Sequence, residues 1–127
     1  MRALVTGGAK RLGREISVYL ANRGYDVAVH YNSSKNEALD VATEINSQGR
    51  LSECLKCDLI IEDQVKALVP LASEALGGPI SMLVNNASIF EHDSFDDATR
   101  GSWDRHMESN LRAPFVLTQA FSKQSPS

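Results

Sequence analysis

The first residues able to do chemistry lie in one glycine-rich stretch, Thr6–Arg14. Glycines stand at positions 7, 8 and 13, and Lys10 and Arg11 place two cations between them. Apolar residues before the stretch predict a strand and those after it a helix, so the glycines mark the turn that joins the two. The amino end of a helix presents free backbone N–H groups and a partial positive charge, which suit a phosphate. We therefore predict that this turn binds the pyrophosphate of a dinucleotide.

A glycine pattern alone is weak support for a ligand, and a turn that binds nothing is the alternative. The stretch is not a Walker-type loop, because no Gly-Lys-Ser or Gly-Lys-Thr follows the glycines. However, Asp58 ends another predicted strand, and Asn85–Ser88 follows a further one. If these runs are parallel strands, their carboxyl ends share one edge of the sheet. The rest of the chain therefore favours the ligand-binding interpretation.

The residues at the end of the second predicted strand indicate which dinucleotide would bind. In folds of this type an acidic residue about 20 residues beyond the glycine turn accepts hydrogen bonds from the adenosine ribose. Residues 30–34 occupy that place, and none of them is Asp or Glu. Without a carboxylate to repel it, a 2′-phosphate is admitted, and Asn32, Ser33 and Ser34 offer donors to it beside the charges of Lys10, Arg11 and Lys35. The sequence therefore favours NADP(H) over NAD(H).

Strand patterns alternate with helical patterns along the chain. Strands are predicted at 2–6, 26–31, 51–58 and 80–84, and helices at about 12–23, 35–47 and 62–76, with a long fourth helix from Thr99 or Ser102 to Ala120. Pro70 is expected to kink or break the third helix near Val69, and Pro114 lies inside the fourth. The first helix shows apolar Leu12, Ile16, Tyr19 and Leu20 at helical spacing and is expected to bury a face through them. This alternation predicts an α/β fold with a parallel sheet in the order 3-2-1-4 and a ligand at the switch point between strands one and four.

Length and composition set the broad class. A chain of 127 residues with 43% hydrophobic residues is typical of one globular domain, here residues 1–127. A formal net charge of −3 argues against a nucleic-acid partner. No apolar run reaches membrane-spanning length, and the first strand begins at once, so we expect no membrane association, no signal peptide and a cytoplasmic location.

Two cysteines, Cys54 and Cys57, form a Cys-x-x-Cys pattern. Residues three apart on a strand point to opposite faces, so the two thiols should diverge. A zinc site would also need two more ligands nearby, and none is apparent. We therefore predict no metal and interpret both cysteines as small hydrophobic residues.

These features together resemble the short-chain dehydrogenase/reductase family over the whole chain. The glycine stretch matches the family's Thr-Gly-x-x-x-Gly-x-Gly, except that Arg11 stands in place of the middle glycine, and Asn85–Ser88 resembles its Asn-Asn-Ala-Gly. Asp58 matches the acid that contacts the adenine, and Asn110 matches the family's structural and catalytic asparagine. The resemblance implies a Rossmann-like fold and hydride transfer to a C=O or C=N group. The residues that it and the patterns above assign to the cofactor are Thr6, Gly7, Lys10, Arg11, Leu12, Gly13, His30, Tyr31, Asn32, Ser33, Ser34, Asp58, Leu59, Asn86, Ala87 and Ser88.

Three stretches resemble the pteridine reductase-like branch: Lys10–Arg14, His30–Ser34 and Asn86–Phe90. This resemblance implies that Arg11 reaches the pyrophosphate and the substrate, and that Ser88 and Phe90 line a pterin pocket. A flat heteroaromatic ring could stack between Phe90 and the nicotinamide. The alternative for Phe90 is a loop aromatic that plugs the edge of the core. The implied partner is a small-molecule substrate, and members of the family are usually homo-oligomers.

The family's hydride chemistry also uses a tyrosine, a lysine four residues after it, and a serine on strand five. All three tyrosines here lie in the first quarter of the chain, and the one correctly spaced pair, Tyr31 and Lys35, falls on the adenosine side. Family members are about twice as long, so the resemblance covers their N-terminal half. Two hypotheses follow: a reductase whose sequence is truncated before strand five, or a non-catalytic nucleotide-binding fragment. Either way, we predict that this chain alone is inactive.

Overall fold

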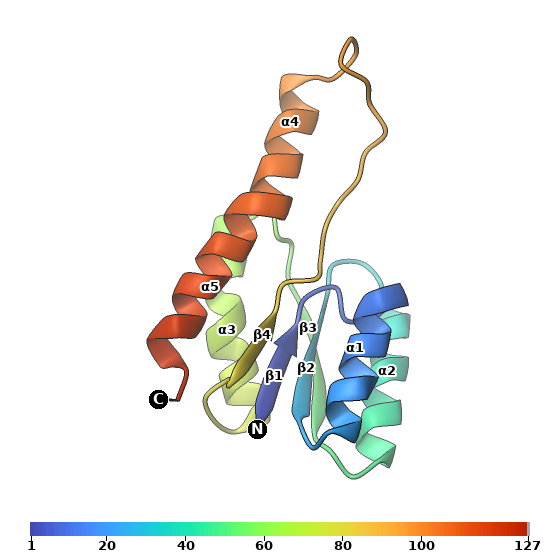
Figure 1. Ribbon diagram of the computed structural model, residues 1–127, viewed down its shortest axis with the longest axis vertical. Coiled ribbons are helices and arrows are strands. Elements are labelled where there is room, and N and C mark those ends of the chain that lie inside the picture. Colours follow the sequence, from blue (N-terminus) through green and yellow to red (C-terminus); the bar gives the residue numbers. More distant parts are fainter. Residues whose placement is uncertain (127) are drawn as a thin grey trace.

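The computed structural model describes residues 1–126 and contains one four-stranded parallel sheet (Figure 1). The strand order is β3-β2-β1-β4, which confirms the predicted order 3-2-1-4. In register, Val5 of β1 lies beside Val29 of β2 and Val84 of β4. Among the described residues no strand pairs with the outer edge of β4. The strands are β1 (Arg2–Val5), β2 (Asp26–Tyr31), β3 (Ser52–Lys56) and β4 (Met82–Val84).

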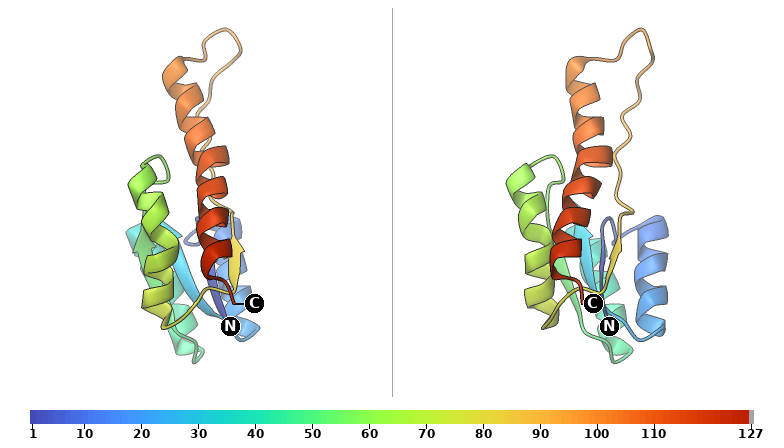
Figure 2. Two further views of the ribbon diagram at one scale, coloured as in Figure 1. Left: turned by 90° about the vertical axis from the view of Figure 1, so that its left-hand side faces the viewer. Right: turned by 60° about the vertical axis from the view of Figure 1, so that its left-hand side comes forward.

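Helices cover both faces of the sheet (Figure 1). The helices α1 (Arg11–Asn22) and α2 (Lys35–Ser47) lie on one face, and α3 (Glu62–Leu76) and α5 (Ala113–Gln124) lie on the other. Ahead of α5, α4 (Arg100–Met107) and the π turn η1 (Glu108–Arg112) extend the same rod beyond the carboxyl edge of the sheet (Figure 2). The segment from β4 to α4 runs alongside this extension.

Two apolar cores result from the alternation of side chains along the strands. Leu4 and Ala28 point to the face covered by α3 and α5, and they pack with Leu68 and Leu117. Their strand neighbours, including Val5, point to the face covered by α1 and α2. The cysteines follow the same rule, since Cys57 belongs to the first core and Cys54 packs against the second. The prediction that their thiols diverge is therefore confirmed.

Helix α1 buries only part of the apolar set predicted for it. Leu20 is buried and Ile16 packs against the core as predicted, but Leu12 and Tyr19 are exposed, and the other buried positions are Gly13, Ser17 and Ala21. The apolar pattern was wrong for Leu12 and Tyr19 because small residues let the helix approach the sheet closely, and the Ser17 hydroxyl donates to the Gly13 carbonyl at 2.9 Å. The buried face is therefore chosen by size more than by hydrophobicity.

The two internal prolines behave differently from each other. Of the kink or break expected near Val69, the break is wrong, because α3 is continuous from Glu62 to Leu76. Pro70 is exposed, so water can reach the Lys66 carbonyl that the proline leaves without a donor. Near Pro114 the predicted single long helix is interrupted, because the Ala113 N–H donates to the Glu108 carbonyl five residues back. This wider π turn gives the Pro114 ring room that a regular α-helix would not.

The start of the long rod was predicted more closely. Thr99 is its N-cap, and its hydroxyl accepts from the Ser102 N–H at 3.0 Å, while the Ser102 hydroxyl accepts from the Thr99 N–H. This reciprocal capping box fixes where α4 begins. No helix within residues 1–126 is both long and apolar enough to span a membrane.

Candidate functional site

The loops after β1 and β4 are joined by one hydroxyl and one amide. The buried Thr6 Oγ1 atom accepts hydrogen bonds from the N–H groups of Asn86 and Ala87, each at 3.0 Å. The Asn86 Nδ2 atom donates in return to the carbonyls of Thr6 and Gly7, at 3.1 and 3.2 Å. The two stretches that the sequence placed at the switch point therefore form one bonded edge.

Gly13 is buried where α1 meets this edge. A Cβ atom added to it would lie 1.8 Å from the Gly7 carbonyl oxygen and 2.7 Å from the Asn86 Nδ2 atom, so no side chain fits. Gly7 itself has a φ of +61°, in the left-handed region that favours glycine. The two glycines bring the first turn of α1 against the strand ends, with its amino end directed to the space above them.

Arg11 adopts a backbone conformation that favours glycine. Its φ of +51° is the one positive value at a non-glycine position within residues 1–126. A left-handed conformation costs roughly 1–2 kcal/mol for a residue with a side chain. Such strain persists where surrounding structure fixes it, and it gathers at functional sites. The turn thus keeps the shape that a glycine would give it while adding an exposed guanidinium.

A cleft of about 350 Å³ opens at this edge. Its walls come from the loop after β1 with the start of α1, from the ends of β2 and β3, and from the loop after β4. Its polar groups include two cations, an amide and the Asp58 carboxylate, which accepts from the Ile60 N–H at 3.0 Å. The lining residues are Gly7, Lys10, Arg11, Leu12, Gly13, His30, Asn32, Asp58, Leu59, Ile60, Asn86, Ala87, Ser88, Ile89 and Ser109.

His30 links two strands beneath the cleft. Its Nδ1 atom accepts from the Gly7 N–H at 2.9 Å, so its Nε2 atom carries the proton and donates to the Cys57 carbonyl at 2.8 Å. The ring is buried, and this burial lowers the pKa of His30 below its ordinary value, although the bond to Cys57 opposes the shift. A protonated imidazole could no longer accept from Gly7. The neutral ring therefore supports the glycine turn.

Acidification is expected to destabilise the fold through His30. Because the folded state lowers the pKa, the unfolded chain binds more protons below pH 6.5, the ordinary histidine value. The contribution of His30 to the free energy of unfolding should therefore be complete above that pH and be lost as the pH falls. Urea unfolding at a series of pH values measures this loss.

Three variants isolate the role of His30. His30→Leu leaves the Gly7 N–H and the Cys57 carbonyl without partners and should cost about 2–4 kcal/mol at neutral pH. His30→Gln keeps an acceptor and a donor that do not titrate, so its free energy of unfolding should fall less than that of the wild type as the pH is lowered. His92→Gln removes an exposed histidine and serves as the control. If His30→Gln loses as much free energy of unfolding in acid as the wild type does, other groups cause that loss.

A comparison with known proteins identifies this architecture. The family model described as short chain dehydrogenase matches residues 1–125. The chain belongs to the short-chain dehydrogenase/reductase family. A curated relative, the 3-oxoacyl-[acyl-carrier-protein] reductase FabG of Staphylococcus aureus, is 34% identical over 122 residues, which are 96% of this chain and 49% of FabG. The chain spans about half the length of the curated relatives that it matches.

Solved structures of the short-chain dehydrogenase/reductase family share the fold. A short chain dehydrogenase from Burkholderia cenocepacia J2315, in complex with NADP, gives a TM-score of 0.95 at 36% identity. The matched region is 99% of this chain and 51% of the Burkholderia chain. FolM alternative dihydrofolate reductase 1 from Brucella canis, complexed with NADP, gives a TM-score of 0.92 at 39% identity. The matched region is 99% of this chain and 50% of the FolM chain. The sheet described above therefore corresponds to about half of each of these family members.

Most residues that the family resemblance assigned to the cofactor line the cleft. Thr6 instead lies beneath it and holds the loop after β4, while Tyr31, Ser33 and Ser34 lie outside the lining. Of the residues assigned to the substrate, Arg11 and Ser88 line the cleft, but Phe90 does not, and it is 83% exposed. Sequence reasoning missed Ile60, Ile89 and Ser109, whose types carry no chemical signal, although each is adjacent to a residue that was singled out.

Asn110, the asparagine that the family resemblance singled out, lies in η1 and does not line the cleft. Its amide pairs with the backbone of Ile89, donating to the Ile89 carbonyl at 2.9 Å and accepting from the Ile89 N–H at 2.8 Å. Asn110 therefore acts on the cleft through the wall segment next to Ser88. A catalytic role for Asn110 stays a prediction.

Proposed function

We propose that this chain is the NADP(H)-binding portion of a short-chain dehydrogenase/reductase that acts on a C=O or C=N group of a small molecule. One observation carries the proposal. The amino end of α1 is closed against the strand ends by Gly13 and opens into a cleft beside Lys10 and Arg11. Backbone N–H groups at a helix start and two cations together suit a pyrophosphate.

The residues present fit a dinucleotide along the cleft. Lys10 and Arg11 would hold the pyrophosphate at the start of α1, Asp58 and Leu59 would contact the adenine, and the loop after β4 would face the nicotinamide. The bound cofactor would supply the hydride, and the protein's own contribution here is to hold and orient it. The strained backbone of Arg11 supports this assignment, because the strain serves to place a cation at the cleft.

The end of β2 supports NADP(H) over NAD(H). Asn32 lines the cleft there, and no lining residue on this loop carries a carboxylate that would repel a 2′-phosphate. Ser33, Ser34 and Lys35 follow at once and offer donors and charge. The structural relatives that were crystallised with NADP add support.

A pterin-like substrate is the finer proposal. Arg11 and Ser88 line the cleft together, as the pteridine reductase-like branch would require. The FolM structure, named as an alternative dihydrofolate reductase, is 39% identical to this chain. A planar ring carrying a C=N bond is the substrate type that these residues suit, since Arg11 can donate to ring nitrogens.

The test places a carboxylate at the end of β2. Calorimetric titration of the wild type should show tighter binding of NADPH than of NADH. Asn32→Asp should weaken NADPH binding roughly 10–100-fold, by like-charge repulsion of the 2′-phosphate, and leave NADH binding nearly unchanged or improved. Asn36→Asp adds the same charge on exposed α2, outside the cleft lining, and is the matched control. Tighter NADH binding by the wild type would refute the NADP(H) assignment.

A further inference from the structure

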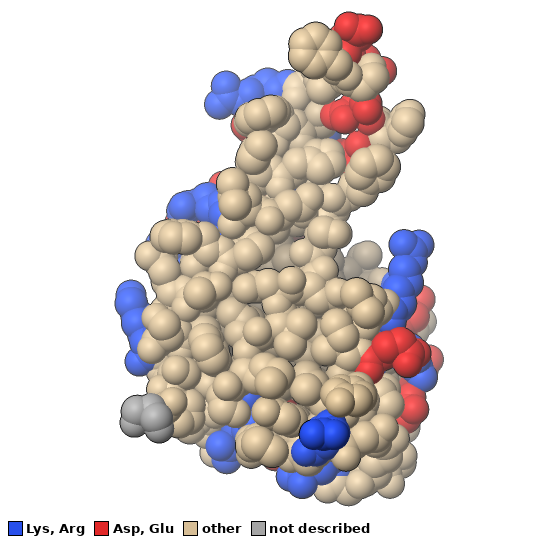
Figure 3. Space-filling view, viewed as in Figure 1, with Lys and Arg blue, Asp and Glu red and all other residues tan. Residues whose placement is uncertain are grey.

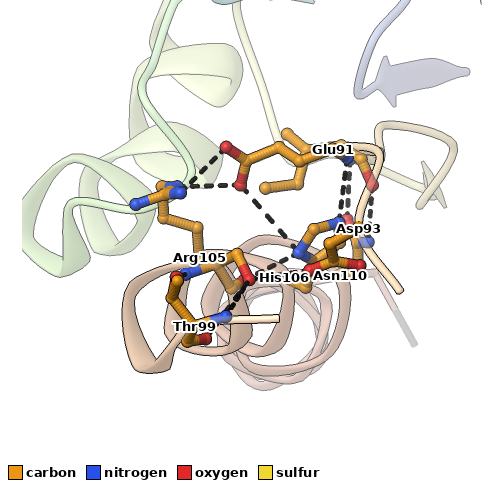
Figure 4. A network of polar contacts seen from close by, with 8 residues as sticks. Glu91, Asp93, Thr99, Arg105, His106 and Asn110 are labelled. Carbon is orange, nitrogen blue, oxygen red and sulfur yellow. Dashed lines mark hydrogen bonds and ion pairs between the residues drawn. The ribbon is translucent and has the colours of Figure 1, made fainter. Parts of the chain in front are cut away.

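The segment that follows the cleft wall is attached to the α4–η1 rod at regular intervals (Figure 4). Besides the Ile89–Asn110 pair, the Glu91 N–H donates to His106 Nε2 at 3.0 Å, and the Ser102 hydroxyl donates to the Asp93 carboxylate at 2.7 Å. Every second residue of the segment therefore meets every fourth residue of the rod. We call this set of contacts the ladder; its rungs are Ile89–Asn110, Glu91–His106 and Asp93–Ser102.

The ladder depends on a match between two repeat lengths. Four helical residues rise about 6 Å. Two extended residues span about 6.6 Å. An extended segment that runs antiparallel to a helix can therefore make a contact at each step without strain. The polar residues Ser102, His106 and Asn110 stand at this spacing and form a stripe toward the segment, and Ser102 is buried.

The middle rung depends on the protonation state of one imidazole. His106 Nδ1 lies 2.7 Å from the Ser102 carbonyl, which can only accept, so the proton of the neutral ring sits on Nδ1. The free electron pair on Nε2 then accepts from the Glu91 N–H. A second proton on Nε2 would set two donors against each other at 3.0 Å and break this rung.

We propose that His106 is a positioning residue, whose neutral ring holds the Glu91 backbone of the wall segment against the rod and whose protonation breaks that bond. The wall segment comprises Ser88–Asp93. The proposal rests on the proposed function, because the wall segment matters only if the cleft binds a cofactor and a substrate. Ser88 and Ile89 line that cleft, three and two residues before Glu91. Neutral His106 would thus keep the substrate side of the cleft in place.

Two carboxylates of the wall segment lie around His106. The Glu91 carboxylate lies 3.9 Å from Nδ1 and is held by Arg105 through two hydrogen bonds, at 2.8 and 2.9 Å. These bonds to Arg105 hold the pKa of Glu91 below its usual range, so Glu91 stays charged in mild acid. Asp93 adds a second carboxylate from the segment. Figure 3 shows acidic side chains gathered over the segment before α4. Because these carboxylates belong to the segment, a cationic ring would still be attracted to it, so protonation frees the Glu91 N–H and leaves the other two rungs in place.

The experiment follows the amide of Glu91 in the 127-residue chain by NMR hydrogen exchange. At about pH 8 the wild-type Glu91 amide should be protected, and the ring nitrogen shifts of His106 should report the Nδ1–H tautomer. At about pH 5 the protection factor, corrected for intrinsic exchange, should fall about tenfold, the loss of one hydrogen bond. A Glu91 amide that is unprotected at the higher pH, or an Nε2–H tautomer, would overturn the proposal.

Variants separate the proton from the shape of the side chain. His106→Gln keeps an acceptor near the Nε2 position, so Glu91 protection should persist and lose its pH dependence; His106→Leu should show low protection at both pH values. His92→Gln, on the same segment and exposed, should behave as the wild type. A pH dependence that survives in His106→Gln would assign the effect to another group and overturn the proposal.

Cofactor titration makes the two proposals separable. Because His106 does not line the cleft, NADPH affinity should differ less than about threefold between His106→Leu and the wild type. If neither the wild type nor any variant binds NADPH, the proposed function fails. The hydrogen-exchange data still decide whether His106 holds the segment. If His106→Leu does not fold, the wild-type tautomer and His106→Gln still decide it.

Discussion

Replacing Gly13 by alanine should remove measurable NADPH binding and destabilise the fold. The added Cβ atom would meet the Gly7 carbonyl oxygen at 1.8 Å, and neither that backbone nor the Asn86 amide can retreat without breaking the edge at the switch point. Overpacking of this kind costs about 1–3 kcal/mol or more. The first turn of α1 would have to move away from the strand ends, and its N–H groups with it. We expect at least a hundredfold weaker NADPH binding, because alignment of several donors is lost together.

Gly101→Ala is the matched control for that substitution. Gly101 lies in the first turn of α4, and a Cβ there would meet the Arg105 Nη1 atom at 3.2 Å, the flexible end of a side chain. Alanine favours a helix over glycine by about 1 kcal/mol, so this variant should be as stable as the wild type or more so. Urea unfolding and calorimetric titration of both variants give the comparison. Gly13→Ala with wild-type affinity would show that the dinucleotide binds elsewhere.

The 127-residue chain should not turn over NADPH with a dihydropterin or a simple ketone. Hydride delivery to either leaves negative charge that an acid must protonate, and a general acid contributes typically 10²–10⁴-fold. Within the described cleft the titratable side chains are two cations, which are poor acids at neutral pH, together with His30 and Asp58. Both ring nitrogens of His30 are bonded to the backbone, and the Asp58 carboxylate holds the Ile60 N–H.

The measurement is NADPH oxidation by purified, monodisperse chain, with an intact family member as the positive control. Turnover within a hundredfold of that enzyme would show that the catalytic groups lie within these residues. Binding without turnover supports a cofactor-holding portion of a reductase or a non-catalytic fragment. A Tyr-x-x-x-Lys sequence in the DNA downstream of Ser127 would favour the reductase.

Strand order and the position of the cleft could be read from the sequence because they depend on local patterns. Alternating strands and helices leave few parallel arrangements, and glycine and asparagine at strand ends mark the shared edge. Asn86 therefore lies against Gly7 as expected. Leu12 and Tyr19 misled the prediction for α1, because a helix packed closely on a sheet selects small residues rather than apolar ones.

Contacts between distant segments could not be predicted. His30 appeared as an ordinary strand residue near the ribose, since nothing local indicates that both its nitrogens bond to neighbouring loops. The ladder had a signal in the spacing of Ser102, His106 and Asn110, but its partner is an extended segment without a pattern of its own. Pro114 was noticed inside the helix, yet whether a proline causes a break, a kink or a π turn depends on what packs around it, as the unbroken helix at Pro70 shows.

The π turn η1 sets the angle between the faces that α4 and α5 present. An α-helix advances about 100° per residue, so in an unbroken helix Leu117 would come within about 60° of Ser102, on nearly the same side. Closing one turn over five residues takes up about one residue and rotates α5 by roughly a quarter of a circle relative to α4. Leu117 therefore shifts from about 60° on one side of Ser102 to about 40° on the other, where it packs in the core that α3 also lines. Deleting one residue from η1 would replace the π turn by a regular helical turn at nearly the same phase, so both faces would keep their directions, but Pro114 would lose the extra room that the π turn gives it.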